Sequence, residues 1–513
     1  MDSTSPTAGR PASGDAHDAS DIAEFGYKQE MKREYGWYAS FALAFGFVSI
    51  ATGLFTTYGS VLNSSGPMGI WTWAIATLGQ VAVALVFGAL VARIPVSGYS
   101  YQWVARLANP TLGWIMGWIS FMFLGVVVVA VDITIASTIL PVLFEYEGNT
   151  MNIYVITAIV VLLQAIMVAW STKVTQKTNN VAVTIQVIGM IAITILLFVV
   201  GWFTGKLDWS NLFSTGAIPA ENYFSLGTWT EAGPWAMGFL IGAFTIVGFE
   251  SAANLSEETH DPARTIPKAM WQAVLSLGVM GMLFLIAVTA TGGDMIALAQ
   301  SPTPIADVIN AVLGGVVGKI LLVMVVISIF SCGLTISLSG ARLVWAMSRD
   351  KRFPGWKVLA KVNPKTGTPL NAMVFMLIIG QVILAIFGFY SADALFALFS
   401  AATLLPALIY AGTVLLYVVK RKVLPPTKGF DLGKWEIPVL IVSSVWLIYE
   451  LAIFRGESFR ESWLYVLVLL AIGGVYLAFL LIRNGKAGLT MPELADIDKE
   501  LDADAEAVEG KLS

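Results

Sequence analysis

The sequence has little of what metal centres and disulfide-bonded folds require. Its 513 residues include one cysteine, Cys332, and two histidines, His17 and His260. A single cysteine excludes an intrachain disulfide, and histidines that lie apart in polar segments predict no His/Cys metal site. The chain also lacks a Walker motif, a dinucleotide-binding glycine pattern and a Ser/His/Asp set. We therefore expect no cofactor, no metal and no ATP hydrolysis.

Charge is scarce as well. Charged residues make up 12 % of the chain, about half of the roughly 25 % that is usual for a soluble domain, whereas apolar residues make up 57 %. A water-soluble fold could not cover its surface with so few charges. The composition therefore predicts a polytopic, all-α membrane protein whose partners are the lipid bilayer and a small-molecule substrate, with no nucleic acid. It leaves the oligomeric state open.

Long apolar runs fill most of the chain. A transmembrane helix needs about 20 apolar residues to cross a ~30 Å hydrocarbon core. Twelve segments meet this requirement: 37–63, 69–92, 113–142, 151–171, 179–204, 234–254, 270–291, 315–346, 370–390, 392–419, 437–454 and 463–483. The polar residues 1–36 lack the apolar stretch of a signal peptide and predict a disordered tail, as do the acidic residues 487–513.

The basic residues are distributed unevenly between the two sides of these spans. Of 30 lysines and arginines, three lie in the tails, and four (Lys206, Lys319, Arg455 and Arg460) lie on one side. All the others lie on the opposite side. Cytoplasmic loops of membrane proteins carry the excess of Lys and Arg. We therefore predict a multi-pass protein of the cell membrane with both termini in the cytoplasm.

Spans 1 and 6 share an interruption near mid-membrane depth. Hydroxyl side chains lie between Gly46 and Gly53 in span 1, and between Gly242 and Gly248 in span 6. Interrupting a helix there frees backbone N–H and C=O groups, which is tolerated where they line a cavity or bind a ligand. Because the two spans are five helices apart, they predict two inverted five-helix repeats whose first helices are discontinuous. The alternative is that these glycines only allow close helix packing.

Four stretches resemble the amino acid–polyamine–organocation transporter superfamily, in the order found there, along about residues 35–485. They are Ser49–Phe55; Arg93–Tyr101, followed by Gly117-Trp118; Gly248–Thr259, followed by Asp261-Pro262 and Ile266–Lys268; and Gly340–Arg342, followed by Arg349-Asp350, Pro354 and Gly367–Pro369. Ala51 stands where the superfamily usually has a glycine. The stretch Thr52–Tyr58 is most similar to the amino acid/choline branch, which includes 4-aminobutyrate permeases.

The resemblance implies a leucine-transporter-like core with a first repeat at 37–204, a second at 234–419, and two further helices at 437–483. It also implies a substrate site. Backbone N–H groups of the half-helix after the first break would hold the substrate carboxylate, and carbonyls at the second break would accept from its ammonium. Two phenylalanines would either pack over the ligand as gates or serve ordinary packing. The implied residues are Ala51, Thr52 and Gly53 at the first break, and Phe244, Thr245, Val247, Gly248 and Phe249 at the second.

Two acidic residues lie deep in the predicted spans, where a charge is costly and marks a functional site by default. Asp132 lies seven residues after Gly125 on the same face of span 3, so it could line the cavity and attract a basic group or carry a proton. A hydrogen bond to a neighbouring helix, or a position near the outer interface, is the alternative. Glu250 follows the second break, at a position that is usually acidic in the superfamily. It either couples protonation to gating or caps freed backbone groups.

The coupling ion is left open between proton and sodium. Several proton-coupled relatives have a lysine in helix 5, and the resemblance places that position at Gln186. Because a glutamine cannot titrate, that mechanism is not predicted here. Proton coupling would run through Glu250 or Asp132 instead, whereas sodium would bind helix 1 carbonyls together with Ser331 and Thr335. Obligate exchange would need neither ion.

Together these features predict a secondary active transporter that moves an amino acid or a related amine, such as 4-aminobutyrate, by alternating access. An exchanger, or a nutrient sensor that keeps the fold without transport, would share the same binding residues. A polytopic membrane enzyme would need converging titratable side chains, and we count only Asp132 and Glu250 as deep in the spans. We therefore predict a transporter and not an enzyme.

Overall fold

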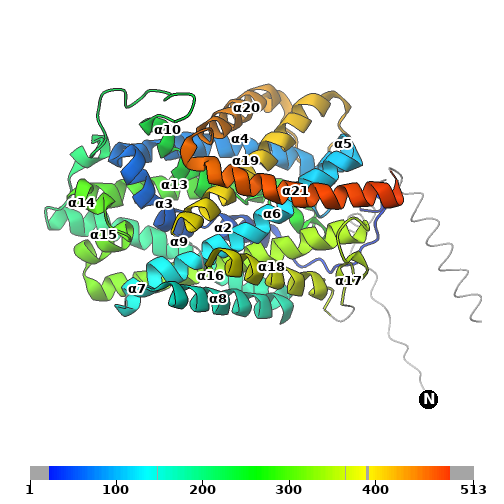
Figure 1. Cartoon of the computed structure of the whole chain (residues 1–513), viewed down its shortest axis with the longest axis horizontal. Coiled ribbons are helices and arrows are strands. Elements are labelled where there is room, and N and C mark those ends of the chain that lie inside the picture. Colours follow the sequence, from blue (N-terminus) through cyan, green and yellow to red (C-terminus); the bar gives the residue numbers. More distant parts are fainter. Residues whose placement is uncertain are drawn as a thin grey trace, which may run out of the picture.

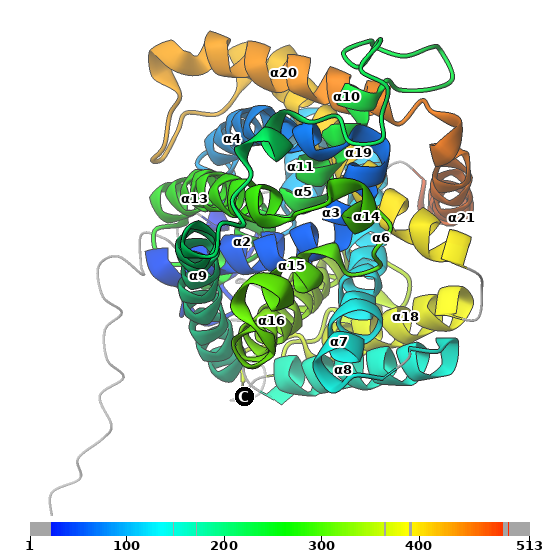
Figure 2. The same ribbon diagram turned by 90° about the vertical axis from the view of Figure 1, so that its left-hand side faces the viewer.

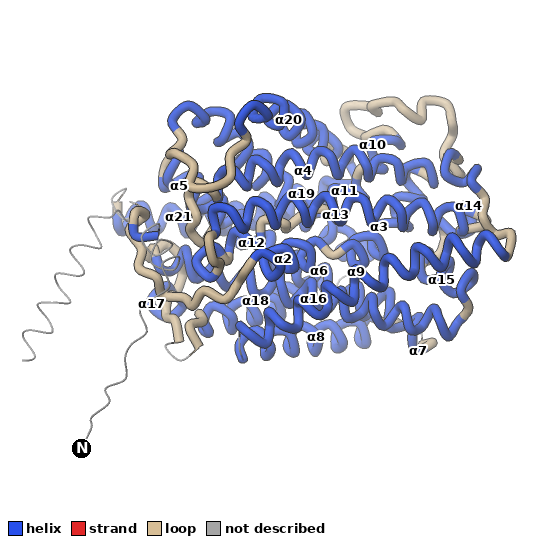
Figure 3. Tube along the Cα trace, turned by 180° about the vertical axis from the view of Figure 1, so that it is seen from behind, coloured by secondary structure: helices blue, strands red, loops and turns tan. Residues whose placement is uncertain are grey.

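The computed structural model describes residues 22–146, 148–170, 172–363, 366–388, 392–485 and 491. Within these ranges the regular structure is helical, and extended pairing is limited to isolated bridges. The long helices lie side by side along the long axis of the bundle, and the connecting loops gather at its two ends (Figures 1 and 3). The prediction of an all-α fold is therefore confirmed for the described part of the chain.

Most helices follow one another with short connections, and the longest described connection, residues 204–233, joins α9 to α10. In chain order the α-helices are α2 (Trp37–Val48), α3 (Ile50–Ser65), α4 (Thr72–Val91), α5 (Tyr99–Leu107), α6 (Pro110–Thr134), α7 (Leu140–Phe144), α8 (Thr150–Trp170), α9 (Thr172–Phe203), α10 (Pro234–Gly238), α11 (Leu240–Thr245), α12 (Ser251–Asn254), α13 (Pro262–Thr291), α14 (Met295–Ala299), α15 (Pro304–Leu313), α16 (Gly315–Arg349), α17 (Trp356–Leu359), α18 (Leu370–Gly388), α19 (Ala392–Lys420), α20 (Glu436–Ile453) and α21 (Arg460–Asn484). A π-helical turn, Ile135–Ile139, joins α6 to α7.

Ten helical stretches of the described residues are long and apolar enough to cross a membrane, which confirms a polytopic membrane protein. They are Trp37–Ser65, Pro67–Val91, Pro110–Phe144, Thr150–Trp170, Lys173–Phe203, Pro262–Thr291, Gly315–Arg349, Ser400–Val423, Gly433–Ile453 and Glu457–Arg483. The predicted spans 234–254 and 370–390 are not among them. The first is not continuous because the helix stops after Thr245, and the second contributes the shorter apolar helix Leu370–Ile386. The total of twelve spans stays a prediction.

Burial separates central from peripheral helices. In the most apolar part of Trp37–Ser65, 89 % of the residues are buried, against 22 % for Thr150–Trp170 and for Glu457–Arg483. The peripheral helices expose apolar side chains such as Ile159 and Val475, as expected where lipid is the solvent. The interrupted first helix, α2 with α3, therefore lies at the centre of the bundle, where it can be reached from several neighbouring helices.

The N-terminal prediction is wrong for residues 22–36. This segment packs against the end of the bundle that also carries α5 and α17, which we call the N-terminal side (Figure 1). Ile22, Tyr27, Met31 and Tyr35 are buried, and the backbone N–H of Tyr35 donates to the carbonyl of Glu258 at 3.0 Å. Apolar side chains spaced four or five residues apart let this otherwise polar segment adhere. The predicted tail residues 1–21, and the tail 487–513 apart from Met491, lie outside the described residues.

Candidate functional site

The first helix is broken at one residue, Ser49. Its backbone has φ 40° and ψ 91°, and it separates α2 from α3. The Ser49 hydroxyl oxygen accepts from the N–H of Thr52 at 3.5 Å and from the side-chain amide of Gln186, on α9, at 3.1 Å. Gln186 thus lies at the first break.

The predicted set of free donors needs a correction. The N–H of Gly53 donates to the carbonyl of Ser49 at 3.1 Å, and the N–H of Thr52 is capped by the Ser49 side chain. Both groups are therefore engaged within the helix start. As the first two residues of α3, Ile50 and Ala51 have N–H groups without an intrahelical partner. Of the predicted donors, Ala51 alone remains, and Ile50 joins it.

The second break covers residues 246–250, between α11 and α12. Gly248 has φ 88°, a conformation that favours glycine, and its N–H donates to the hydroxyl of Tyr410 at 2.8 Å. The same hydroxyl donates to the carboxylate of Glu250 at 2.6 Å. Tyr410, on α19, therefore bridges the unwound backbone and the acidic residue that follows it. The predicted interruption of this helix is present.

The two breaks touch each other. A Cβ atom at Gly53 would overlap the side chain of Thr245, the last residue of α11, and a Cβ atom at Gly248 would overlap the ring of Phe47 in α2. The Thr245 hydroxyl is buried and has no hydrogen-bond partner among the described residues. Glycine is thus required at both positions because the two broken helices, α2–α3 and α10–α12, approach each other closely. Gly248 is also required for its backbone conformation.

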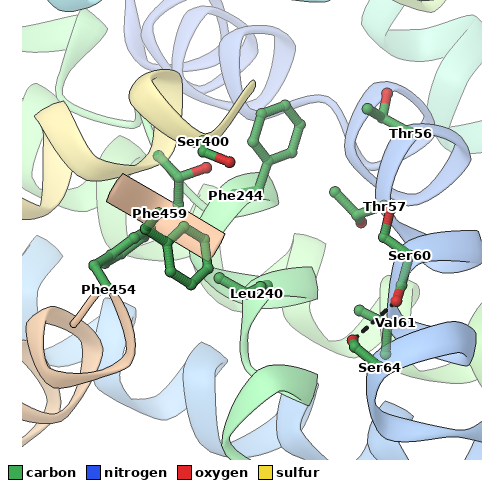
Figure 4. A pocket seen from close by; sticks show the side chains of 11 residues that line it. Thr56, Thr57, Ser60, Val61, Ser64, Leu240, Phe244, Ser400, Phe454 and Phe459 are labelled. Carbon is green, nitrogen blue, oxygen red and sulfur yellow. Dashed lines mark hydrogen bonds between the residues drawn. The ribbon is translucent and has the colours of Figure 1, made fainter. Parts of the chain in front are cut away.

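A cavity of about 270 Å³ lies beside α3, on the side of the breaks away from the N-terminal segment. Figure 4 shows one wall made by α3 and the facing wall made mostly by phenyl and aliphatic side chains. The lining residues are Thr56, Thr57, Ser60, Val61, Ser64, Leu240, Phe244, Ser400, Thr403, Phe454 and Phe459. Among the predicted site residues, Phe244 lines this cavity. The cavity has a hydroxyl-rich wall and no charged side chain in its lining.

Three of the four hydroxyls that α3 contributes to the cavity wall donate their protons to carbonyls of α3. Thr56 donates to the carbonyl of Thr52 at 2.7 Å, and Thr57 donates to the carbonyl of Gly53 at 2.8 Å. Ser64 donates in the same way to the carbonyl of Ser60, at 2.9 Å. These hydroxyls therefore present lone pairs to the cavity, so they can accept hydrogen bonds from a ligand.

The other predicted residues of the breaks lie beneath the cavity and do not line it. Ala51, Thr52 and Val247 are buried. Phe249 is fully buried, with its ring 5.2 Å from that of Tyr410 and 6.0 Å from that of Phe87. The structure therefore places Phe249 in an aromatic cluster and not over the cavity, because the turn at Gly248 directs the next side chain away.

Asp132 lies behind the cavity. The side-chain amide of Gln164, on α8, donates to its Oδ1 at 2.7 Å and to the carbonyl of Phe330 in α16 at 3.0 Å. Asp132 is fully buried, and a π-helical turn begins three residues later. These contacts match the alternative of a hydrogen bond to a neighbouring helix. They do not place the carboxylate among the cavity-lining residues.

The hydroxyls considered as sodium ligands meet a side chain from α9. Ser331 and Thr335 each donate to Oδ1 of Asn179 at 3.0 Å. A Cβ atom at Gly46 would overlap the same oxygen, so Asn179 packs directly on α2. A neutral amide thus joins helix 1 to α16 at the place where the sequence suggested an ion.

Sequence reasoning missed several of these residues. Tyr410 lies in an apolar run and Asn179 in a polar one, and no sequence pattern marks either as a site residue. Their partners come from distant parts of the chain. Glu450, in α20, was also missed as a deep acidic residue: it is fully buried, and neither carboxylate oxygen has a hydrogen-bond partner among the described residues. Its acidic side chain within an apolar span was a signal that could have found it.

The N-terminal side is closed by ion pairs between two of the recognised motifs. The Arg342 guanidinium contacts the Glu258 carboxylate at 2.7 Å, with side-chain exposures of 0 % and 2 %, and Arg349 contacts Glu257 at 2.8 Å. The Arg349 guanidinium also lies 3.6 Å from the ring of Tyr27. Burial raises the pKa of Tyr27, so its hydroxyl stays protonated and donates to Asp350 at 2.9 Å.

Comparison with known proteins identifies the family to which this chain belongs. The family profile described as "Amino acid permease" matches residues 35–475, which is most of the chain. The chain belongs to the amino acid permease family. The resemblance inferred from the four motifs is thereby confirmed, and the matched region of this permease includes both helix breaks and the ion-paired residues.

Several curated relatives cover most of this permease. "Amino-acid permease BAT1" of Arabidopsis thaliana is 26 % identical over 83 % of this chain and 86 % of its own length. Its homolog in Oryza sativa subsp. japonica is 26 % identical over 90 % and 92 %. The "GABA-specific permease" of Saccharomyces cerevisiae is 23 % identical over 83 % and 76 %. These names confirm that the protein is a transporter and not an enzyme, and they imply small amino acid substrates.

Proposed function

We propose that this permease is a secondary active transporter that moves an amino acid or a related amine, such as 4-aminobutyrate, across the membrane by alternating access. The observation that carries the proposal is the contact between two helix breaks directly beneath a cavity on one side of the bundle. Broken helices at the centre of a transporter expose backbone groups that bind charged substrates. The opposite, N-terminal side is closed by buried ion pairs.

The two breaks offer complementary charges. The start of α3 carries about half a positive charge and the N–H groups of Ile50 and Ala51, which suit a carboxylate. The last carbonyls of α11 suit an ammonium, and the Thr245 hydroxyl stands between them with no partner among the described residues. Since Ala51 and Thr245 are buried, the substrate reaches them when Phe244 moves. Phe244 would thus act as the gate between cavity and site.

The α3 wall favours a substrate whose second charged group is an ammonium rather than another carboxylate. Its hydroxyls donate to their own helix, so the remaining lone pairs accept from an ammonium. The absence of a charged side chain among the lining residues is consistent with a substrate that is neutral overall. A 4-aminobutyrate-like zwitterion fits this lining, and the yeast relative named as GABA-specific adds to the case.

The coupling ion in this proposal is the proton. Glu250 is the titratable group at the second break, and its bond to Tyr410 ties its protonation to the unwound backbone at Gly248. The Ser331 and Thr335 hydroxyls donate to the neutral amide of Asn179, and this proposal assigns no ion to them. Gln186 contributes as a neutral bond to Ser49 and not as a titrating group.

We further propose that the molecule sits in the cell membrane with twelve helices, two inverted repeats and both termini in the cytoplasm. The broken helices α2–α3 and α10–α12 would then be the first helices of the two repeats. The excess of basic residues on the N-terminal side supports this orientation. An exchanger or a sensor with the same fold is the alternative that flux measurements separate.

The proposal is tested by uptake of labelled 4-aminobutyrate into proteoliposomes, with α-amino acids, polyamines and choline as competitors. We expect accumulation under an imposed proton gradient and no change when potassium replaces sodium. Accumulation that requires sodium would contradict the coupling assignment. Binding without accumulation, in empty and in preloaded vesicles, would contradict transport itself, whereas flux seen only in preloaded vesicles would replace active transport by exchange.

A pair of matched variants tests the α3 wall. Thr57→Val removes the lone pairs and keeps the side-chain shape, so we expect about tenfold weaker uptake of 4-aminobutyrate and little change for alanine. Thr204→Val is the control, since Thr204 also donates to its own helix, at 2.7 Å, but lies outside the cavity. Equal losses for both substrates in Thr57→Val would refute amine recognition by this wall.

A further inference from the structure

An apolar groove of about 660 Å³ runs along the outer surface of the bundle beside the first half of the broken helix. Its base is α2, which contacts both α9 and α13 and lies between them (Figure 2). Phe41 and Phe45 of α2 form the floor, with ring centroids 5.5 Å apart, and Ile188 and Val279 belong to the two walls. The groove therefore joins the three helices that would have to shift relative to one another if α2 moved.

The walls of the groove face the bilayer. All three helices belong to stretches that are long and apolar enough to cross a membrane. On α13, Leu275, Val279 and Leu283 are 39 %, 56 % and 50 % exposed, one helical turn apart. Lipid is the solvent of such a surface, so its natural occupant is an acyl chain.

Polar and basic groups lie next to one end of the groove, where the Trp37 ring stacks on that of Phe41. Trp37 and Tyr38, which are 43 % and 44 % exposed, mark the headgroup level, since Trp and Tyr concentrate at the membrane–water interface. The Lys268 ammonium lies 5.7 Å from the Trp37 ring and has no carboxylate within ion-pair distance among the described residues. A phosphate beside Lys268 would provide the missing opposite charge.

The length of the groove matches one leaflet. Gln272 bonds to Trp37 at 3.0 Å and so lies at the headgroup level, and Leu283 lies at the other end. At 1.5 Å per residue, these positions on α13 are roughly 16 Å apart along the helix, about half of the ~30 Å hydrocarbon core. A lipid of the leaflet on the N-terminal side would therefore fill the groove with its chain while its headgroup stayed at Lys268.

We propose that an anionic phospholipid binds in this groove, with one acyl chain along Phe41 and Phe45 and its phosphate beside Lys268. Because α2 is half of the broken helix, a lipid that binds only when α2, α9 and α13 are arranged as observed stabilises that conformation by mass action. Removing the lipid therefore makes movement of α2 easier. The bound lipid thus acts on the conformational cycle from outside the substrate path. This site does not depend on the transport function proposed above.

Native mass spectrometry of the purified full-length protein, delipidated and then titrated with phosphatidylglycerol or phosphatidylcholine, tests the site. We expect tighter binding of phosphatidylglycerol by the wild type and about fivefold weaker binding of it by Lys268→Ala, with phosphatidylcholine unchanged. Ser276→Leu fills the groove and should weaken both lipids. Matched controls are Lys422→Ala, an exposed lysine at the end of α19, and Ala471→Leu, an exposed alanine on α21.

Two results would overturn the proposal: equal affinity of the wild type for both lipids, or wild-type affinity of Lys268→Ala for phosphatidylglycerol. If Ser276→Leu did not yield folded protein, Ser276→Cys provides the same test after folding. The native Cys332 is buried, so a maleimide with an alkyl chain would react at position 276 alone and occupy the groove. Unchanged phosphatidylglycerol binding after that reaction would also reject the site.

Discussion

At the scale of single residues, neutral hydrogen-bonding side chains hold both helix breaks in place. Gln186 bonds to Ser49 at the first break, and Tyr410 bonds to Gly248 and Glu250 at the second. Buried backbone groups that lose their helical partners are costly unless another group satisfies them. The Tyr410 side chain from α19 therefore satisfies the free N–H of Gly248, and Gln186 from α9 holds the Ser49 side chain that caps the start of α3.

Removing the Tyr410 hydroxyl should expose this dependence. Tyr410→Phe removes one hydrogen-bond partner from the Gly248 N–H and one from the Glu250 carboxylate, each at a cost of about 1–3 kcal/mol. We expect initial uptake rates to fall at least tenfold and the pH profile of uptake to change, because Glu250 loses its donor. Tyr417→Phe is the control on the same helix, since Tyr417 bonds to Glu436 away from the breaks. Wild-type rates and pH profile in Tyr410→Phe would contradict this role.

Asp132 has a different expected behaviour from a substrate-binding carboxylate. Gln164→Leu removes its donor and should destabilise the protein by about 1–3 kcal/mol, measured by thermal unfolding in detergent. Asp132→Asn keeps the Oδ1 acceptor and should preserve most of that stability. We expect Asp132→Asn to affect cationic and zwitterionic substrates equally. A selective loss of cationic substrates would instead place the carboxylate in the substrate path.

At the scale of elements, each broken helix packs its glycine against the other. Gly53 of α3 faces Thr245 of α11, and Gly248 faces Phe47 of α2. The two contacts lie on opposite sides of the first break, so the half-helices interlock as a pair. A side chain at either glycine would therefore push the two helices apart.

Gly53→Ala should therefore abolish uptake and also lower thermal stability. The added Cβ would overlap Thr245, and the double variant Gly53→Ala/Thr245→Gly should recover part of the stability by removing that side chain. Gly474→Ala on α21 is the control, because nothing lies within 4 Å of its Cβ position and alanine favours a helix by about 1 kcal/mol. A stable Gly53→Ala protein that lost only ligand binding would show instead that the added Cβ atom crowds the ligand and leaves the helix packing intact.

At the scale of the whole molecule, one side is closed by charge and the other holds the cavity. The Arg342–Glu258 pair connects α16 to the turn that follows α12, and the backbone N–H of Tyr35 bonds to the carbonyl of Glu258. Opening this side requires these contacts to separate. In the proposed alternating-access cycle, the buried ion pairs would separate and their charged groups would become hydrated when the N-terminal side opens.

Removing one charge of the Arg342–Glu258 pair should lower the stability of the protein more than removing both charges. Arg342→Leu or Glu258→Leu leaves a buried charge alone, at a cost of about 3–5 kcal/mol, whereas the double variant removes both charges and should be more stable than either single variant. Thermal unfolding of the three variants measures the difference. Lys319→Ala, which breaks the exposed Lys319–Glu145 pair, should change stability little. Additive losses in the double variant would argue against direct coupling.

The sequence by itself determined the membrane-embedded all-α class, most helix boundaries and the family. These follow from local properties: apolar runs of spanning length, glycines at fixed places and motifs in order. It also located both interruptions, since Gly46–Gly53 and Gly242–Gly248 mark them within single helices. It failed for residues 22–36, whose burial depends on surfaces made by distant segments.

The tertiary structure decided which groups meet at the breaks. It moved the free donors of α3 to Ile50 and Ala51, assigned Ser331 and Thr335 to Asn179, and gave Glu250 a partner in Tyr410. It also separated Phe244, which lines the cavity, from Phe249, which does not. Each of these depends on side chains more than a hundred residues apart or on the direction of an irregular turn. Such contacts leave no periodic trace in the chain, because they are fixed only when the helices pack.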